Sequence, residues 1–160
     1  MLTENMTAAE VLEKYRDDVY RLAAYLPWLT EKSGTSVSSV YRADGEGRPT
    51  VAFPVYDATL LKFVKEAQAT GLMDRNYHYV MSRNRLRDAA DVRNFISNLT
   101  ILQMDQWAGV LSYYVLGGQT KSRLWSEGMS EGIFLDLVEK AKELIDFWTN
   151  AEVTKGEQSE

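Results

Sequence analysis

The apolar residues of this chain recur three and four positions apart over most of its length, a spacing that lines one face of an α-helix. The clearest stretch runs from residue 101 to residue 148. It predicts a buried helix, a break at Gly117-Gly118, a short aromatic turn at Leu124-Trp125 and a long closing helix. We expect the glycines to end the first helix in the left-handed conformation that glycine adopts without steric cost. We expect the two helices on either side of this break to form the centre of the core.

An N-terminal helix is predicted from Thr7, because Thr7 and Glu10 form a capping-box pair and an apolar stripe follows as far as Leu26. Pro27 is expected to stop this helix, since proline disfavours helical geometry at the residue before it. Three shorter helices are predicted behind aspartates that make favourable N-caps, at Asp57, at Asp74 and at Asp88 or Asp91.

The segment between residues 33 and 54 lacks helical periodicity. Strand-favouring residues flank an acidic, glycine-rich stretch, which indicates either a short β-hairpin or a mobile loop near residues 37–53. The pattern as a whole predicts a mainly α fold, a single-domain bundle of about six helices. Residues 1–149 are expected to form this domain, and residues 150–160 a frayed polar tail.

Composition narrows the classes of function. A chain of 160 residues suits one domain with a substantial core, and its net charge of -5 disfavours broad, non-specific binding to DNA. The absence of cysteine excludes disulfides, thiolate catalysis and cysteine-ligated metals, and the single histidine argues against histidine-rich metal sites. No apolar run approaches the roughly 20 residues of a membrane span. We therefore expect a cytoplasmic protein without cofactor or metal.

The most informative polar segment is rich in arginine and tyrosine, and it contains the only histidine. Arginine suits the recognition of carboxylates and phosphates, and tyrosine can stack on a partner. The candidate binding surface comprises Arg75, Tyr77, His78, Tyr79, Arg83, Arg85, Arg87 and Arg93. Alternatively, the segment is an ordinary solvated face whose arginines are neutralised by nearby aspartates. A secondary candidate surface comprises Arg123, Trp125 and Glu127. No spacing points to a catalytic residue.

Several motifs are similar to those of a family of small bacterial and prophage proteins that is catalogued as a domain of unknown function. The motifs are Phe53-Pro54-Val55-Tyr56, Gly71-Leu72-Met73-Asp74 with Tyr77, Leu111-Ser112-Tyr113-Tyr114-Val115, and Leu124-Trp125 followed by Glu131-Gly132-Ile133-Phe134-Leu135. The resemblance implies a compact, mainly helical fold and an association with mobile genetic elements. It implies no activity and no catalytic residues.

The sequence favours a non-enzymatic helical module that binds another protein. With the family context, a narrower hypothesis is an inhibitor of a bacterial nucleic-acid defence system, such as an anti-CRISPR protein. A second hypothesis is a small enzyme or ligand-binding protein with a polar pocket between helices, drawing on Tyr56, Tyr77, His78, Arg123 and Glu127. A third is nucleic-acid binding through the arginines, which predicts affinity that falls steeply with salt.

Overall fold

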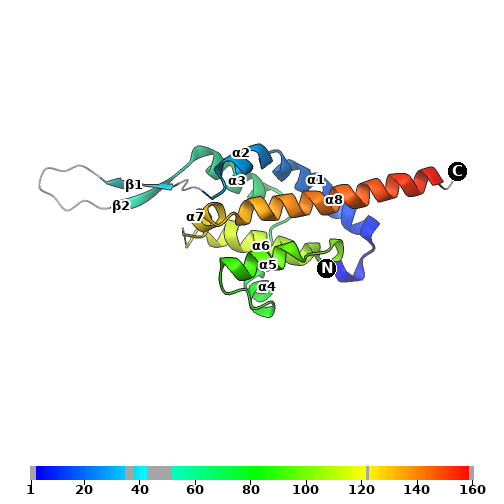
Figure 1. Cartoon of the computed structure of the whole chain (residues 1–160). Helices are drawn as coiled ribbons and strands as arrows, with labels where there is room; N and C mark the ends of the chain where they lie inside the picture. The colour runs from blue at the N-terminus through cyan, green and yellow to red at the C-terminus, as the bar shows by residue number, and fades with distance from the viewer. Residues whose placement is uncertain (1–2, 35–37, 43–51, 122, 159–160) are drawn as a thin grey trace, which may run out of the picture.

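The computed structural model describes residues 3–34, 38–42, 52–121 and 123–158, and it is mainly α-helical (Figure 1). Within these residues the α-helices are α1 (Ala8–Ala23), α2 (Leu26–Lys32), α3 (Ala58–Ala69), α4 (Tyr77–Arg83), α5 (Ala89–Ser97), α6 (Met104–Gly117), α7 (Arg123–Ser130) and α8 (Ile133–Gln158). Two short 3₁₀ helices are η1 (Thr3–Asn5) and η2 (Ile101–Gln103). The predicted fold class is confirmed. The described residues contain two helices more than the six expected, namely α2 and α7.

The start of α1 follows the predicted capping box. The Thr7 hydroxyl accepts a hydrogen bond from the Glu10 amide at 3.2 Å, and the Thr7 amide donates to the Glu10 carboxylate at 3.1 Å. The end of α1 differs from the expectation, because Pro27 lies in the first turn of α2 and begins a second helix. First-turn amides have no acceptor within their own helix, so proline loses no hydrogen bond there.

Between α2 and α3, strands β1 (Ser38–Arg42) and β2 (Ala52–Tyr56) pair in antiparallel register, with Val40 opposite Pro54. Of the two structures that the sequence allowed here, these strands correspond to the hairpin. Residues 43–51, on which the mobile-loop alternative also depends, lie outside the described residues. The strands project away from the helices (Figure 1), so the helices alone form the core.

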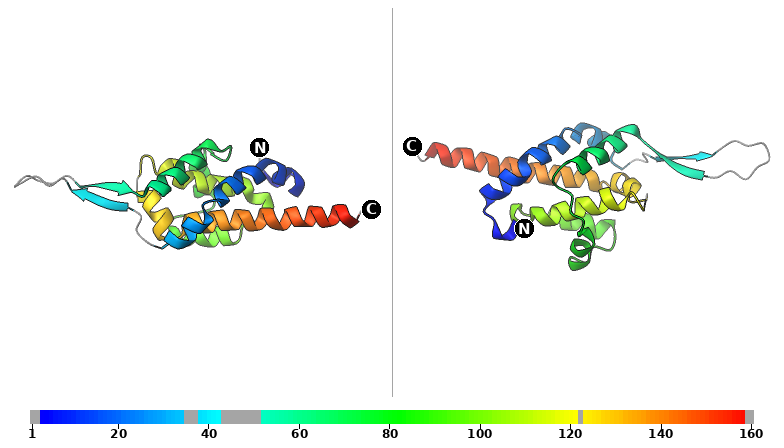
Figure 2. Two further views of the ribbon diagram at one scale, coloured as in Figure 1. Left: turned by 90° about the horizontal axis from the view of Figure 1, so that it is seen from above. Right: turned by 180° about the vertical axis from the view of Figure 1, so that it is seen from behind.

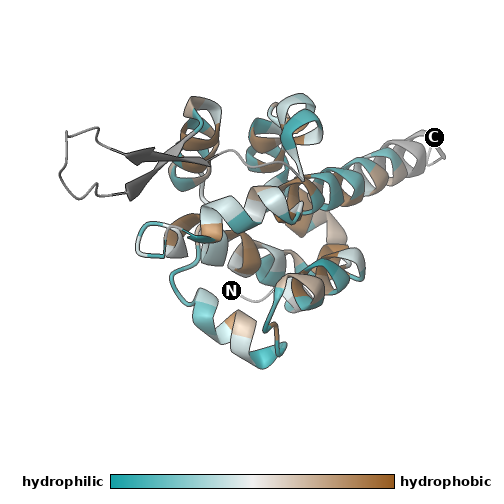
Figure 3. Cartoon of the chain, turned by 60° about the vertical axis from the view of Figure 1, so that its left-hand side comes forward, coloured by the Kyte–Doolittle hydropathy of each residue, from teal (hydrophilic) through white to brown (hydrophobic). Residues whose placement is uncertain are grey.

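The core lies where α8 packs against α1 and α6 (Figures 1 and 2). Leu111 of α6 and Phe134 of α8 are both fully buried, as the stripes of the two helices predict. The indole Nε1 of Trp107 donates to the Leu137 carbonyl at 2.8 Å, which satisfies a polar group inside the core. Phe63 of α3 meets the Phe134 ring edge-on, with the ring centroids 5.2 Å apart. Figure 3 shows apolar residues on the helix sides that face one another.

The break after α6 is formed differently from the prediction. Gly118 caps α6 in the right-handed region, with φ −66° and ψ −18°, so the expected left-handed conformation is wrong. A β-carbon at Gly118 would overlap the indole of Trp125. The Trp125 Nε1 donates to the Val115 carbonyl at 3.1 Å, and Trp125 belongs to helix α7 instead of a turn. The glycine is therefore needed for close packing.

The closing helix is longer than predicted. Its backbone is helical from Ile133 to Gln158, so residue 149 does not mark an end of secondary structure. Residues 150–158 contain no proline, and Ala151, Glu152 and Lys155 favour helix, so helical backbone continues beyond the apolar stripe. No described helix combines the length and the apolar character needed to cross a membrane.

Candidate functional site

Helix α4 carries four of the eight residues predicted for the main binding surface, and it packs closely on α6. Val80 and Met81 are its buried residues. Val80 faces Gly109 of α6, where an added β-carbon would lie 2.6 Å from the Val80 Cγ2 atom. The glycine thus lets the two backbones approach. This packing buries one side of α4. The polar residues of α4 lie on the two flanks of that buried side.

The end of α4 places an arginine in a strained conformation. The Arg85 amide donates to the Ser82 carbonyl at 3.1 Å, and the Leu86 amide donates to the Met81 carbonyl at 3.0 Å. These two bonds form a Schellman motif, which requires a left-handed residue and usually contains glycine there. Arg85 takes that position with φ +55°. Its side chain is exposed just beyond the helix end.

The neighbouring aspartates do not neutralise the arginines. Each accepts a hydrogen bond from a backbone amide instead: Asp74 from Asn76 at 2.8 Å, Asp88 from Asp91 at 2.8 Å, and Asp91 from Arg87 at 3.1 Å. Within the described part of the chain, four arginines form no salt bridge, namely Arg75, Arg83, Arg85 and Arg87. These four guanidinium groups are therefore not held by a salt bridge within the described part of the chain.

Arg93 does not belong with the other arginines. It lies on α5, and its Nε is 2.8 Å from a carboxylate oxygen of Asp136 on α8. The hydrogen bond and charge of Asp136 raise the pKa of Arg93. The side chain thus has a structural partner, because folding brings α8 beside α5. We remove Arg93 from the candidate surface.

One flank of α4 borders an open groove of about 450 Å³. His78, Arg85 and Arg87 are its charged or ionisable residues. The remaining lining is formed by Met81, Ser82, Leu86 and Tyr113. We call this feature the arginine groove. It combines two unpaired guanidinium groups with apolar side chains from α4, the loop that follows it and α6.

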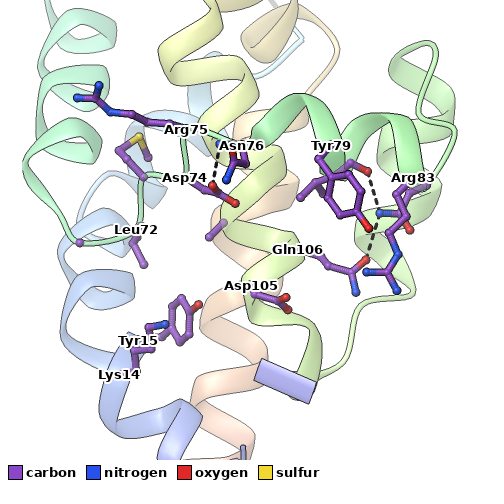
Figure 4. A pocket seen from close by; sticks show the side chains of 15 residues that line it. Lys14, Tyr15, Leu72, Asp74, Arg75, Asn76, Tyr79, Arg83, Asp105 and Gln106 are labelled. Carbon is purple, nitrogen blue, oxygen red and sulfur yellow. Dashed lines mark hydrogen bonds between the residues drawn. The ribbon is translucent and has the colours of Figure 1, made fainter. Parts of the chain in front are cut away.

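The other flank of α4 borders a cavity of about 440 Å³ that also involves α1, the loop before α4, and α6 (Figure 4). Tyr79 and Arg83 of α4 form one wall. The other polar residues that line it are Lys14, Tyr15, Asp74, Arg75, Asn76, Asn84, Asp105 and Gln106. The Asn84 amide nitrogen joins the helices by donating to the Val80 carbonyl and to the Gln106 side-chain oxygen, at 2.9 and 3.1 Å. We call this feature the α1–α4 cavity.

Tyr77, Arg123 and Glu127 line neither of these two sites, although they lie next to the arginine groove. Tyr77 is half-buried, and its ring lies 4.5 Å from that of His78 and 5.9 Å from that of Tyr113, measured between centroids. Arg123 and Glu127 form a salt bridge of 3.2 Å along α7. They line a cavity of about 40 Å³ that shares Met81, Leu86, Arg87 and Tyr113 with the arginine groove but is not lined by Tyr77 or His78. The set proposed for an inter-helix pocket is therefore not one site. The Tyr56 side chain lies outside the described residues.

Seven polar residues of the α1–α4 cavity were not among the predicted site residues, namely Lys14, Tyr15, Asp74, Asn76, Asn84, Asp105 and Gln106. The position of Tyr15 in the apolar stripe of α1 predicted a core residue. Asp105 and Gln106 could have indicated a polar site in the sequence, because they are two adjacent polar residues in a mainly apolar helix. Among the described residues, no three histidine, aspartate or glutamate side chains are grouped as a metal site requires.

Comparisons of this chain with protein-family models, curated proteins and solved structures return no match. The resemblance to prophage proteins therefore stays a prediction from the motifs. Function has to be argued from the two sites beside α4.

Proposed function

We propose that this chain is a non-enzymatic binding protein whose arginine groove recognises an acidic segment of another protein. The observation that carries the proposal is that Arg85 and Arg87 line the groove without a carboxylate partner in the described part of the chain. A guanidinium group binds a carboxylate through two parallel hydrogen bonds. Two unpaired guanidinium groups at one groove thus suit glutamate or aspartate side chains of a partner.

The floor of the groove favours a protein over a nucleic acid as the partner. Met81 is buried, and Leu86 and Tyr113 are half-buried beside it. Such side chains accept an apolar anchor, and aromatic and arginine residues contribute most strongly to protein interfaces. The net charge of -5 also repels a phosphate backbone over the rest of the surface.

The backbone of Arg85 supports a role in recognition. A left-handed arginine costs about 1–2 kcal/mol relative to a conformation in the right-handed region. Glycine would occupy the same position without that cost. Locally unfavourable residues concentrate at functional sites, where their side chains are needed. Glycine would lack the guanidinium group that Arg85 presents at the groove, and this group is what we propose the site requires.

The family resemblance extends this proposal. In the extended form, the chain is a cytoplasmic inhibitor of a bacterial nucleic-acid defence system, such as an anti-CRISPR protein, and the partner is a protein subunit of that system. Binding of an acidic protein segment in the arginine groove would be its mode of action.

Affinity capture from nuclease-treated bacterial lysate tests the proposal. The wild-type chain is expected to retain a stoichiometric protein partner, and the double variant Arg85→Ala/Arg87→Ala is expected to lose it. Arg93→Ala is the matched control, because it removes an arginine that is close in sequence but is paired with Asp136. Equal capture by the double variant, or capture lost equally in the control, would contradict the groove as the interface.

A second measurement distinguishes nucleic-acid binding from the proposed binding of a protein. Fluorescence anisotropy with labelled single-stranded and duplex DNA is recorded between 50 and 200 mM salt. Binding that falls steeply with salt and is lost in the double variant would favour nucleic acid and refute a protein partner. The proposal expects no such binding.

A further inference from the structure

The α1–α4 cavity is lined by a tyrosine hydroxyl that forms no hydrogen bond with the described residues. Tyr15 is only 4% exposed, and its side chain lines the cavity. Figure 4 shows the hydroxyl pointing into the space in front of Asp105. Among the described residues, no group donates to this hydroxyl or accepts from it. A phenol hydroxyl at the wall of a cavity can both donate a hydrogen bond to a ligand atom and accept one from it.

Two carboxylates, those of Asp105 and Asp74, line the same cavity as this hydroxyl. One oxygen of Asp105 accepts from the Thr3 hydroxyl at 2.5 Å, and one oxygen of Asp74 accepts from the Asn76 amide at 2.8 Å. Neither of their second oxygens takes part in a hydrogen bond within the described residues. Burial, and then the charges of Asp105 and Asp74, raise the pKa of Tyr15 to about 12, so the hydroxyl keeps its proton at neutral pH. The inner cavity thus offers one donor beside two acceptors.

This combination matches the hydroxyl groups of a sugar. Each sugar hydroxyl donates one hydrogen bond and accepts others, so neighbouring hydroxyls satisfy a carboxylate and a phenol together. Carboxylates bind ribose hydroxyls in the same way in dinucleotide-binding folds. A metal ion would need a third acidic or histidine ligand, and the described residues do not supply one.

The outer part of the cavity is cationic and aromatic. Lys14 of α1 and Arg83 of α4 stand on opposite walls, and Arg75 lies in the loop between Asp74 and Asn76 (Figure 4). Lys14 and Arg83 can each bind an anionic group of a ligand, whereas the Arg75 guanidinium points away from the cavity (Figure 4). The Tyr79 side chain is 64% exposed, so its ring is available for stacking on a planar group.

We infer that the α1–α4 cavity binds a nucleoside monophosphate, with the ribose hydroxyls at Tyr15 and Asp105, the phosphate at Arg83, and the base against Tyr79. The cavity volume of about 440 Å³ is within the range of small-molecule sites. This binding is independent of the proposed protein partner, because the arginine groove lies on the opposite flank of α4 and uses other arginines.

Isothermal titration calorimetry of the full chain with AMP and with UMP tests the inference. At least one of them is expected to bind saturably. Tyr15→Phe removes only the hydroxyl and is expected to weaken binding about 3- to 10-fold, the value of one hydrogen bond. Tyr20→Phe is the matched control on the same helix, because the Tyr20 hydroxyl bonds Asp146 outside the cavity. It is expected to leave affinity unchanged.

Fragments and an exposed variant complete the test. Adenosine and inorganic phosphate are each expected to bind more weakly than AMP, and the exposed substitution Arg83→Gln is expected to weaken AMP binding about 10-fold without affecting the fold. Failure of both nucleotides to bind at millimolar concentration would overturn the inference. Phosphate binding as tight as AMP binding, or an AMP affinity unchanged from the wild type in both Tyr15→Phe and Arg83→Gln, would overturn it as well.

Discussion

Replacement of Arg85 separates a backbone contribution to stability from a side-chain contribution to binding. Arg85 has φ +55° at the end of α4, a conformation that costs a residue with a side chain about 1–2 kcal/mol. Glycine removes this cost, but it adds about 0.4–1 kcal/mol of entropy to the unfolded chain. Arg85→Gly should therefore be more stable than Arg85→Ala by about 0.5–1 kcal/mol. Both variants lack the guanidinium, so both should lose the captured partner equally.

Urea unfolding followed by circular dichroism measures this difference, with the two variants compared at the same pH. In a chain of this length the midpoint of thermal unfolding should be about 2–4 °C higher for each kcal/mol gained by the glycine variant. Equal stability of the glycine and alanine variants would refute a left-handed residue at this position. A glycine variant that gains stability but still captures the partner would refute the role of the Arg85 side chain.

Three other changes test the fold and the cavity. Gly109→Ala places a methyl group against Val80 and should lower the free energy of unfolding in urea by about 1–3 kcal/mol. An unchanged urea unfolding curve would contradict this expectation. Phe134→Ala empties a fully buried position and should cost about 3–5 kcal/mol by the same assay, whereas a loss below 1 kcal/mol would place the ring outside the core. Because burial and Asp105 raise the pKa of Tyr15 to about 12, this residue contributes stability that is complete below pH 10 and declines as the pH rises to about 12. The wild type should therefore lose more stability than Tyr15→Phe between pH 9 and pH 12, and parallel losses would contradict this assignment.

The sequence predicted those parts of the fold that depend on local interactions. The capping box of Thr7 and Glu10 and the stripes through Leu111 and Phe134 correspond to the observed helices and core. Pro27 was misjudged, because proline is equally compatible with the end of one helix and the first turn of the next. The short helix α7 was missed, since few apolar positions fit into its eight residues.

The two sites beside α4 depend on tertiary packing and were only partly predictable. The arginines were visible in the sequence, but their division between the groove and the cavity follows from the contact of Val80 with Gly109. The pairing of Arg93 with Asp136 was not visible in the local sequence, because the two residues are 43 positions apart in the chain. Tyr15 fitted the apolar stripe, and only the arrangement around its hydroxyl distinguishes it from a core residue.

The shortness of α4 has a consequence for how recognition is distributed in this molecule. Seven residues are too few for a helix to persist alone in water, because the cost of nucleation exceeds the gain from so few hydrogen bonds. A synthetic peptide of residues 75–87 should therefore be a random coil and a poor mimic of either site. The packing of Val80 on Gly109 of α6, more than the arginines themselves, holds α4 in its helical shape. Transfer of either binding site to another protein would therefore require α6 as well as α4.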